Sequence, residues 1–343
     1  MTTKISNHLQ EYYQDHVSML INVEINSVGK IAAGWESEIF AFNLTHGSPE
    51  NRASEELVLR RFPGDDAGEK SANEFRAIQR LNEIGYPAPQ VYLYEHERSP
   101  FGMPFTIMER LHGGDMWGIL DTADADTYPE LMAIFSRLVV QLHQLDWRHF
   151  VDEDEQPRYE NPYTFIDHWL NIAEEGHARF PHSGLLPVLE WIQTRRDDFY
   201  CPKPSPVHND FHPGNVILQP NGLPVVIDWT GFDVSDPRFD LGWLLMLLYA
   251  YPGAEARELM LHQYEEFSGE TVDNLACFEV FACTRRIFDL SVSLNLGAET
   301  QGMRPEAVEA MRGHKTAHGR MYEMLTQRTG IRVPKFEELL AAL

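Results

Sequence analysis

The stretch PVHNDFHPGNVILQPNGLPVVIDW, from Pro206 to Trp229, carries the strongest structural signal in the 343-residue chain. Its dipeptide Asn221-Gly222 separates two runs rich in valine and isoleucine, and it favours a β-hairpin because both residues tolerate positive φ. A two-residue loop would set Asn215 opposite Asp228. Pro220 fits that register poorly, since it falls in the hydrogen-bonded pair that closes the turn, so a slipped or longer loop stays open.

Oxygen-bearing side chains gather around this predicted hairpin. His208 and Asp210 lie on the HPG-containing loop just before it, so local geometry alone predicts that Asp210, Asn215 and Asp228 cluster. Carboxylate and amide oxygens suit Mg²⁺, which keeps several waters and takes its remaining ligands from substrate phosphates. A separate carboxylate beside such a metal can accept a proton from an attacking hydroxyl.

Upstream of this stretch, the first hundred residues predict a five-stranded sheet with one helix. Glu24–Leu44 holds short β-favouring runs around glycines, and Thr45–Glu56 is interpreted as a polar turn. Ser71–Gly85 has apolar residues at helical spacing and ends at a glycine. The remaining strands are expected in Leu57–Phe62, QVYLYEHE (90–97) and MPFTIMERL (103–111).

From Leu111 onward the pattern is helical, with one β-rich island at 205–230. His112–Gly114 reads as a flexible joint. We therefore expect a small N-terminal sheet lobe, residues 1–111, and a larger helical lobe, residues 112–343. Helices are predicted in Leu131–Trp147, His168–Ala173, Leu186–Arg196, Leu241–Tyr251, Ala254–Phe267 and Leu275–Leu294.

Composition excludes several classes of protein. The 28 basic and 52 acidic residues give a net charge of −24, so nucleic acid or an anionic membrane is a poor partner, whereas a cationic small molecule is compatible. The longest strongly apolar run, Leu241–Tyr251, is too short to span a bilayer, and the polar N-terminus has no apolar signal core. Three scattered cysteines indicate free thiols, so we expect a cytoplasmic protein.

Two motifs carry a resemblance to a known family. The spacing H-x-D-x-x-x-x-N over His208–Asn215, followed by a hairpin that ends at Asp228, resembles the aminoglycoside phosphotransferase and choline kinase group of small-molecule kinases. DPRFDLGWLL (Asp236–Leu245) resembles the segment that follows in this group. The resemblance extends more weakly from about residue 25 to 330. It implies an α+β, protein-kinase-like fold with two lobes, and transfer of the γ-phosphoryl of MgATP or MgGTP to a small-molecule hydroxyl.

The resemblance also implies roles for individual residues of the larger lobe. Asp210 matches the catalytic aspartate that orients and deprotonates the acceptor hydroxyl, while Asn215 and Asp228 match the metal ligands. His208 and Asp240 match residues that support the catalytic loop, so their expected roles are structural.

In the N-terminal lobe, Arg60 stands where the family usually has a phosphate-anchoring lysine, and Glu74 matches its acidic partner. A guanidinium can bind phosphate bidentately, although the two cations are not interchangeable. Gly34 and Ser37 lie where the phosphate-covering turn is expected, with one glycine and two nearby acids. The stretch that contains Met108, Glu109 and Leu111 matches the adenine-binding hinge.

Two other functions stay open at this point. A metal-dependent hydrolase could use His208, Asp210, His212 and Asp228, although Pro213-Gly214 argues against helical zinc ligation by the two histidines. A non-catalytic nucleotide-binding module would suit Arg60 and the sparse glycine turn. No motif identifies the acceptor, so an aminoglycoside-like compound, an amino alcohol and a metabolic hydroxyl compound all stay open. The sequence does not predict the oligomeric state.

Overall fold

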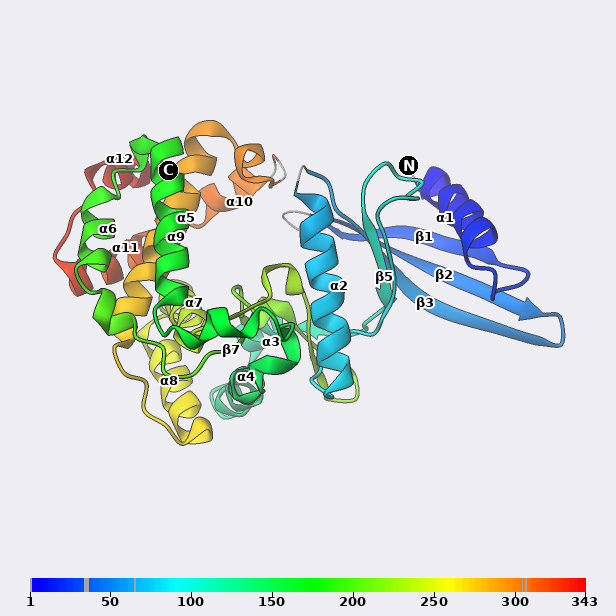
Figure 1. Cartoon of the computed structure of the whole chain (residues 1–343), viewed down its shortest axis with the longest axis horizontal. Coiled ribbons are helices and arrows are strands. Elements are labelled where there is room, and N and C mark those ends of the chain that lie inside the picture. The colour runs from blue at the N-terminus through cyan, green and yellow to red at the C-terminus, as the bar shows by residue number, and fades with distance from the viewer. Residues whose placement is uncertain (1, 34–36, 65, 304, 306) are drawn as a thin grey trace. The chain divides into compact units, whose positions relative to one another are not determined.

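The computed structural model describes residues 2–33, 37–64, 66–303, 305 and 307–343, and the chain divides into two compact units (Figure 1). The first unit combines Met1–Gly114 with Ile217–Thr230, and the second combines Asp115–Val216 with Gly231–Leu343. The first continuous stretch therefore ends three residues beyond the predicted lobe boundary. Residues 217–230, which the sequence assigned to the larger lobe, belong to the first unit.

The first unit is built on a five-stranded antiparallel sheet with strand order β1-β2-β3-β5-β4 (Figure 1). The predicted α+β, protein-kinase-like fold class is confirmed by this sheet and the mostly helical unit that follows it. The strands are β1 (Glu24–Ala33), β2 (Glu38–Ser48), β3 (Asn51–Arg61), β4 (Val91–Glu95) and β5 (Phe105–Glu109).

Alternation along the strands decides which face of the sheet is buried against which helix. Phe40 and Phe42 of β2 and Leu59 of β3 are fully buried in one apolar cluster, to which α1 (Thr2–His16) contributes Leu9. Arg60 follows the buried Leu59 in β3, and because successive side chains alternate, it belongs to the other face. The second helix, α2 (Ala67–Glu83), contacts β4 and β5 and buries Ile78 and Leu81.

One expectation for this unit is wrong, and one helix was not predicted. Thr45–Glu56 is mostly strand, because β2 continues to Ser48 and β3 begins at Asn51, with Ser48 paired to Asn51. Backbone hydrogen bonds extend the hairpin beyond the apolar core. This outer part of the hairpin is exposed, which is why its side chains are polar. The N-terminal segment, expected only to be polar, forms α1, whose buried Ile5, Leu9, Tyr12 and Tyr13 follow helical spacing.

The loop of the β8 (Val216–Leu218) and β9 (Pro224–Val226) hairpin is also longer than the two residues expected. Gln219 N–H donates to the Leu223 carbonyl over 3.0 Å, and Gly222 N–H donates to the Gln219 carbonyl over 2.8 Å. This arrangement suits Pro220 at the second position of a type I turn and Gly222 at its positive φ of 80°. The register shifts by one residue, so the predicted pairing of Asn215 with Asp228 is wrong.

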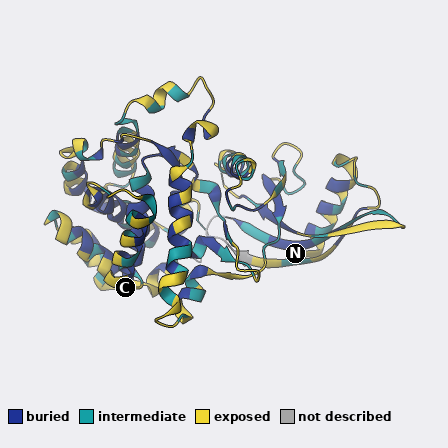
Figure 2. Ribbon diagram, turned by 90° about the horizontal axis from the view of Figure 1, so that it is seen from below, coloured by how far each residue is buried: buried dark blue, intermediate teal, exposed yellow. Residues whose placement is uncertain are grey.

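The second unit is mostly helical and has its core around α7 (Pro237–Ala250) and α9 (Leu275–Leu296). Gly242 of α7 allows close packing, since a Cβ there would lie 2.8 Å from the backbone of Phe278. Helix α7 has no exposed residue, whereas other helices of the chain carry buried residues along one side and exposed residues along the other (Figure 2). No helix among the described residues is both long and apolar enough to cross a membrane.

The remaining regular elements are short strands, helices and single 3₁₀ turns. The strands are β6 (Gly114–Asp115), β7 (Ser205–Val207) and β10 (Asp233–Ser235). The helices are α3 (Met116–Thr122), α4 (Thr127–Gln144), α5 (Thr164–Arg179), α6 (Leu186–Gln193), α8 (Ala254–Ser268), α10 (Ala307–Gly313), α11 (Lys315–Thr329) and α12 (Pro334–Ala342). The 3₁₀ turns are Trp147–Phe150, Gln156–Glu160, Pro181–Ser183, Arg196–Phe199, Pro213–Asn215, Trp229–Gly231 and Ala298–Gln301.

Candidate active site

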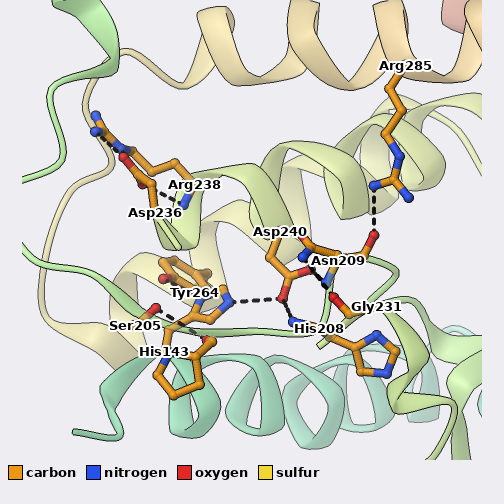
Figure 3. A network of polar contacts seen from close by, with 11 residues as sticks. His143, Ser205, His208, Asn209, Gly231, Asp236, Arg238, Asp240, Tyr264 and Arg285 are labelled. Carbon is orange, nitrogen blue, oxygen red and sulfur yellow. Dashed lines mark hydrogen bonds and ion pairs between the residues drawn. The ribbon is translucent and has the colours of Figure 1, made fainter. Parts of the chain in front are cut away.

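The catalytic loop, defined here as His208–Asp210, follows β7, which pairs antiparallel with β10. The Asp240 carboxylate of α7 is buried beneath this loop. One of its oxygens accepts the His208 N–H over 2.7 Å and the other accepts the Asn209 N–H over 2.8 Å (Figure 3). A carboxylate that accepts two backbone N–H groups fixes the path of the main chain, because each bond is charge-assisted.

Further hydrogen bonds surround the catalytic loop. The Asn209 side-chain amide donates to the Gly231 carbonyl over 2.9 Å, and Arg285 of α9 donates to the Asn209 carbonyl over 2.8 Å (Figure 3). His143 of α4 lies 3.3 Å from Asp240 and 3.0 Å from the Tyr264 hydroxyl. Asn209 has a φ of +63°, a left-handed conformation that such surrounding contacts can hold.

The Asp210 side chain is fixed at one oxygen and open at the other. Trp243 Nε1–H of α7 donates to Oδ1 over 2.8 Å, and His212 Nε2 lies 3.7 Å from Oδ2. The side chain remains 45% exposed. Desolvation works to raise the pKa of Asp210, but His212, Arg285 and His208 outweigh it and hold the pKa well below its ordinary value. Asp210 is therefore ionised at neutral pH.

Asn215 ends the 3₁₀ turn that follows this loop. Its Nδ2 donates to the Asp210 carbonyl over 2.9 Å, which fixes the amide so that its oxygen is the atom available to a cation. His212 caps the same turn, since its Nδ1 accepts the Gly214 N–H over 3.0 Å. That bond commits Nδ1 as an acceptor. The described residues contain no group of three or more His, Cys, Asp or Glu side chains arranged to hold a metal.

A second cluster of charges lies within the first unit, around Arg60. This side chain is 9% exposed, forms an ion pair with Glu74 and donates to Asp228 Oδ1 over 2.7 Å. Its Nε donates to Ser37 Oγ over 3.0 Å. Asp228 itself has a φ of +66°, and its Oδ1 also accepts from Thr230 over 3.1 Å. Left-handed conformations at a non-glycine residue concentrate at functional sites.

The burial of Glu74 changes its acidity. Desolvation outweighs the opposing effect of Arg60 and, together with the nearby Asp228, raises the pKa of Glu74 to about 7. Arg60 thus pairs with two acidic residues, Glu74 and Asp228, of which Glu74 is the one whose acidity is weakened by burial.

The predicted hinge runs along the end of β5. Glu109 N–H donates to the Gln90 carbonyl over 2.9 Å, and Arg110 N–H donates to the Glu56 carbonyl over 3.2 Å. Met108 pairs with Val58 in the sheet. An adenine-binding role for Met108, Glu109 and Leu111 stays a prediction. Because the N–H groups of Glu109 and Arg110 are already bonded, this role would use other backbone groups of the stretch. Gly34 lies outside the described residues.

The structure thus brings the predicted site residues together in two groups. Ser37, Arg60, Glu74 and Asp228 cluster in the first unit, whereas His208, Asp210, Asn215 and Asp240 cluster in the second.

Sequence reasoning missed two partners of the second group. Trp243 lies in the apolar run Leu241–Tyr251, and its side chain is buried in the core, but its N–H reaches Asp210. Arg285 is a charged residue in the apolar run of α9, and that interruption is the signal that could have revealed it.

The fold and the two groups together define a two-lobed phosphotransferase architecture, and comparison with known proteins gives the family. Residues 27–276 match the family model described as the phosphotransferase enzyme family, APH, so the chain belongs to this family. The predicted resemblance is therefore confirmed.

Solved structures agree on the fold. A putative aminoglycoside phosphotransferase from Ralstonia eutropha JMP134 is 17% identical with a TM-score of 0.66, and the alignment covers 94% of this chain and 98% of that one. The complex of APH(2″)-IIIa with GDP and kanamycin is 16% identical with a TM-score of 0.58, covering 90% and 98%. A ternary complex of APH(4)-Ia with ADP and hygromycin B has a TM-score of 0.54 at 16% identity, covering 96% and 99%.

Curated relatives are longer proteins. The acyl-CoA dehydrogenase family member 11 of Rattus norvegicus is 23% identical over 265 residues, which cover 72% of this chain and 30% of the relative. The Homo sapiens protein of the same name is 25% identical over 204 residues, covering 57% and 25%. The chain thus matches less than a third of the length of these relatives.

Proposed function

We propose that this protein is a small-molecule kinase that transfers the γ-phosphoryl group of MgATP or MgGTP to a hydroxyl group. The observation that carries the proposal is Asp210, an ionised and accessible carboxylate on a loop whose backbone is fixed by Asp240 and Arg285. Phosphoryl transfer needs positioning more than covalent catalysis, so a rigid loop with one open carboxylate oxygen fits that chemistry.

Asp210 would accept a hydrogen bond from the acceptor hydroxyl. The hydroxyl oxygen attacks the γ-phosphorus, a new O–P bond forms, and the bond from the γ-phosphorus to the β–γ bridging oxygen breaks. The nucleoside diphosphate leaves with that electron pair, and the hydroxyl proton passes to the Asp210 carboxylate. Because the pKa of Asp210 is low, the carboxylate is a weak base, and its main contribution is to orient the hydroxyl.

Asn215 and Asp228 offer an amide oxygen and a carboxylate, which is an oxygen donor set that fits Mg²⁺. These two residues would hold the metal. When bound, Mg²⁺ supplies neutralisation of the phosphate charge. Arg60 would anchor nucleotide phosphate through its guanidinium, and Glu74 would orient it. The Gly34–Ser37 turn would cover the phosphates, and the Met108–Leu111 stretch would hold the adenine edge.

We propose the acceptor only as a class of compound. Relatives of known structure are described with kanamycin or hygromycin B, and the net charge of −24 suits a cationic acceptor such as an aminoglycoside-like compound or an amino alcohol. A cytoplasmic location, with no nucleic acid or membrane as partner, remains part of this proposal. The buried and unpaired Cys201, Cys277 and Cys283 are compatible with it.

One observation favours a second function, that of a non-catalytic nucleotide-binding module. Arg60, the predicted phosphate anchor, forms an ion pair with Asp228, the predicted metal ligand. If that ion pair persists with nucleotide present, the metal is not held and turnover is lost.

The test is release of ADP or GDP from MgATP or MgGTP with a panel of aminoglycosides, amino alcohols and neutral alcohols. Acceptor-dependent release is expected from the wild type and should fall at least about 10³-fold in Asp210→Ala. Asp154→Ala, which changes an exposed aspartate, is the matched control and should retain full activity. Equal activity in Asp210→Ala would refute its role, and nucleotide binding without any release would favour the second function.

A further inference from the structure

The Arg60 guanidinium joins three separate segments of the sheet unit. Its Nε donates to Ser37 Oγ just before β2, its Nη1 contacts Glu74 of α2, and its Nη2 donates to Asp228 Oδ1 after β9. A guanidinium presents its donors in a rigid planar fork, whereas a lysine ammonium is a compact point charge. Arginine can therefore hold Asp228 and Glu74 at the same time in a fixed geometry.

These three partners of Arg60 differ in how far a ligand can reach them. Ser37 and Glu74 are buried, so their contacts with Arg60 are internal to the unit. The Asp228 side chain is 39% exposed, whereas that of Arg60 is 9% exposed. Of the three partners, Asp228 is therefore the one that an incoming phosphate group can replace on the guanidinium without entering the core.

The ion pair also limits what Asp228 can offer to a metal ion. Asp228 Oδ1 accepts from Arg60 over 2.7 Å and from the Thr230 hydroxyl over 3.1 Å, and these two bonds match the two lone pairs of one carboxylate oxygen. A divalent cation at the same carboxylate would be repelled by the guanidinium, because like charges repel strongly where little water separates them. Metal binding at Asp228 and the contact of Arg60 with Asp228 therefore oppose each other.

A nucleotide removes this opposition, because it brings negative charge of its own. A phosphate group can accept two parallel hydrogen bonds from a guanidinium, as a carboxylate can. When Arg60 bonds to phosphate in place of Asp228, the carboxylate is released and its charge becomes available to a divalent cation. Ser37 and Glu74 keep their contacts with Arg60, so the guanidinium stays in place during the exchange.

We propose that Arg60 and Asp228 form an exchangeable ion pair, which makes binding of the divalent cation depend on binding of the nucleotide. Nucleotide phosphate takes the place of Asp228 on Arg60, and the cation takes the place of Arg60 on Asp228. Each ligand thus favours the other beyond any direct contact between them. This inference rests on the proposed kinase function and concerns its nucleotide and metal, not its acceptor.

The first test measures binding of Mn²⁺ alone, in the absence of nucleotide, from the loss of the EPR signal of the free ion. Arg60→Lys keeps the charge but lacks the fork, so the ammonium should stay with Glu74, and Kd for Mn²⁺ should fall at least about threefold. Arg60→Ala removes the competing cation altogether, and Kd should fall at least about tenfold. Unchanged Kd values in both variants would overturn the inference.

Arg52→Ala is the matched control for Arg60→Ala, because it removes one positive charge from the same unit. Arg52 is exposed and pairs with Glu24, and the contacts of the described residues do not connect it to Asp228. Its Kd for Mn²⁺ should stay within about twofold of wild type, since salt screens charges that are far apart. An equal fall in both variants would show that net charge alone controls the affinity, and would overturn the inference.

The second test measures ATP binding in the presence of EDTA by isothermal titration calorimetry. Asp228→Asn removes the carboxylate that competes with phosphate for Arg60, so Kd for ATP should fall at least about threefold. Because loss of a negative charge favours ATP in any case, Arg60→Ala is compared with the double variant Arg60→Ala/Asp228→Asn. The gain should disappear in the Arg60→Ala background, and a gain of equal size in both backgrounds would contradict the exchange.

These outcomes are distinguishable from failure of the kinase function. Unchanged Mn²⁺ affinity in the Arg60 variants, together with acceptor-dependent release of nucleoside diphosphate by the wild type, overturns the exchange and leaves the kinase intact. The expected Mn²⁺ and ATP results without any release across the acceptor panel support the exchange and overturn the kinase. Absence of both nucleotide binding and Mn²⁺ binding in every variant overturns both.

Discussion

Two ionic clusters, one in each unit and each built around a buried pair, differ in how their charges balance. In the helical unit, Glu279 is fully buried and pairs with Arg257 and Arg328, while Arg257 also contacts Glu258. These contacts join two cations to two carboxylates. In the sheet unit, the contacts of Arg60 among the described residues join one cation to two carboxylates, Glu74 and Asp228.

The difference indicates what each cluster is for. A balanced buried cluster satisfies itself and connects helices, here α8, α9 and α11. The unbalanced cluster keeps a second carboxyl group buried, and this burial raises the pKa of Glu74 to about 7. Perturbed acidity of this kind concentrates at functional sites, because a charge left uncompensated by the protein can be compensated by a ligand.

The largest effect on stability is expected from Glu279→Gln. Loss of this charge leaves Arg257 buried without its main partner, and breaking a buried pair from one side costs about 3–5 kcal/mol of unfolding free energy. Urea denaturation measures the loss, and kcat of the folded fraction should be unchanged. A loss below about 1 kcal/mol would mean that the balanced cluster is not structural.

Arg60→Ala should act on function more than on folding. We expect kcat/KM for the nucleotide to fall about 10²–10³-fold, which corresponds to about 3–4 kcal/mol of transition-state stabilisation. Unfolding free energy should fall by less than in Glu279→Gln, because Glu74 can take up a proton once its cation is gone. Arg60→Lys, which restores the cation usual in the family, should stay within about tenfold of wild type. If Arg60→Ala destabilises the protein as much as Glu279→Gln does and keeps wild-type activity, the two clusters do not differ in function.

His318 of α11 offers a smaller and pH-dependent effect. Burial lowers its pKa to about 4, with Arg286 and His314 acting in the same direction against a hydrogen bond to the Met311 carbonyl. Since the folded-state pKa lies below the unfolded value, stability is full above about pH 6.5 and declines as the pH falls toward 4. The decline should reach about 2–3 kcal/mol, and His318→Gln should abolish it in urea denaturation at pH 7 and pH 4.5. A decline of equal size in the variant would assign the acid sensitivity to other groups.

The smallest effect is expected from Lys335→Ala. Lys335 and Glu338 form an ion pair on the surface, with side chains 63% and 69% exposed. Such pairs contribute about 0–1 kcal/mol, because water screens them and both side chains lose freedom. The free energy of unfolding, measured by thermal denaturation, should fall by no more than about 0.5 kcal/mol. A larger loss would show that burial does not decide how much an ion pair contributes to stability.

The sequence predicted the sheet, the main helices and the family from local patterns. Alternation, helical spacing and the loop motif each involve residues within about twenty positions, and such patterns survive in any tertiary context. The errors arose where two local solutions compete. Asn221-Gly222 fits either a two-residue or a three-residue loop, and Pro220, at the start of the turn, selects the longer one.

By itself, the sequence determined which residue types could carry the chemistry: Asp210, Asn215 and Asp228 stand at fixed spacing around one hairpin, and Arg60 and Glu74 follow strand and helix patterns. Only the tertiary structure decided their partners. Arg60 meets Asp228 from 168 positions away, and Trp243 donates to Asp210 across 33. The helical unit likewise brings Trp169 of α5 and Phe281 of α9 to the wall of one cavity, although they are far apart in sequence. No local period encodes such contacts, because they depend on how faces pack once the helices and strands have formed.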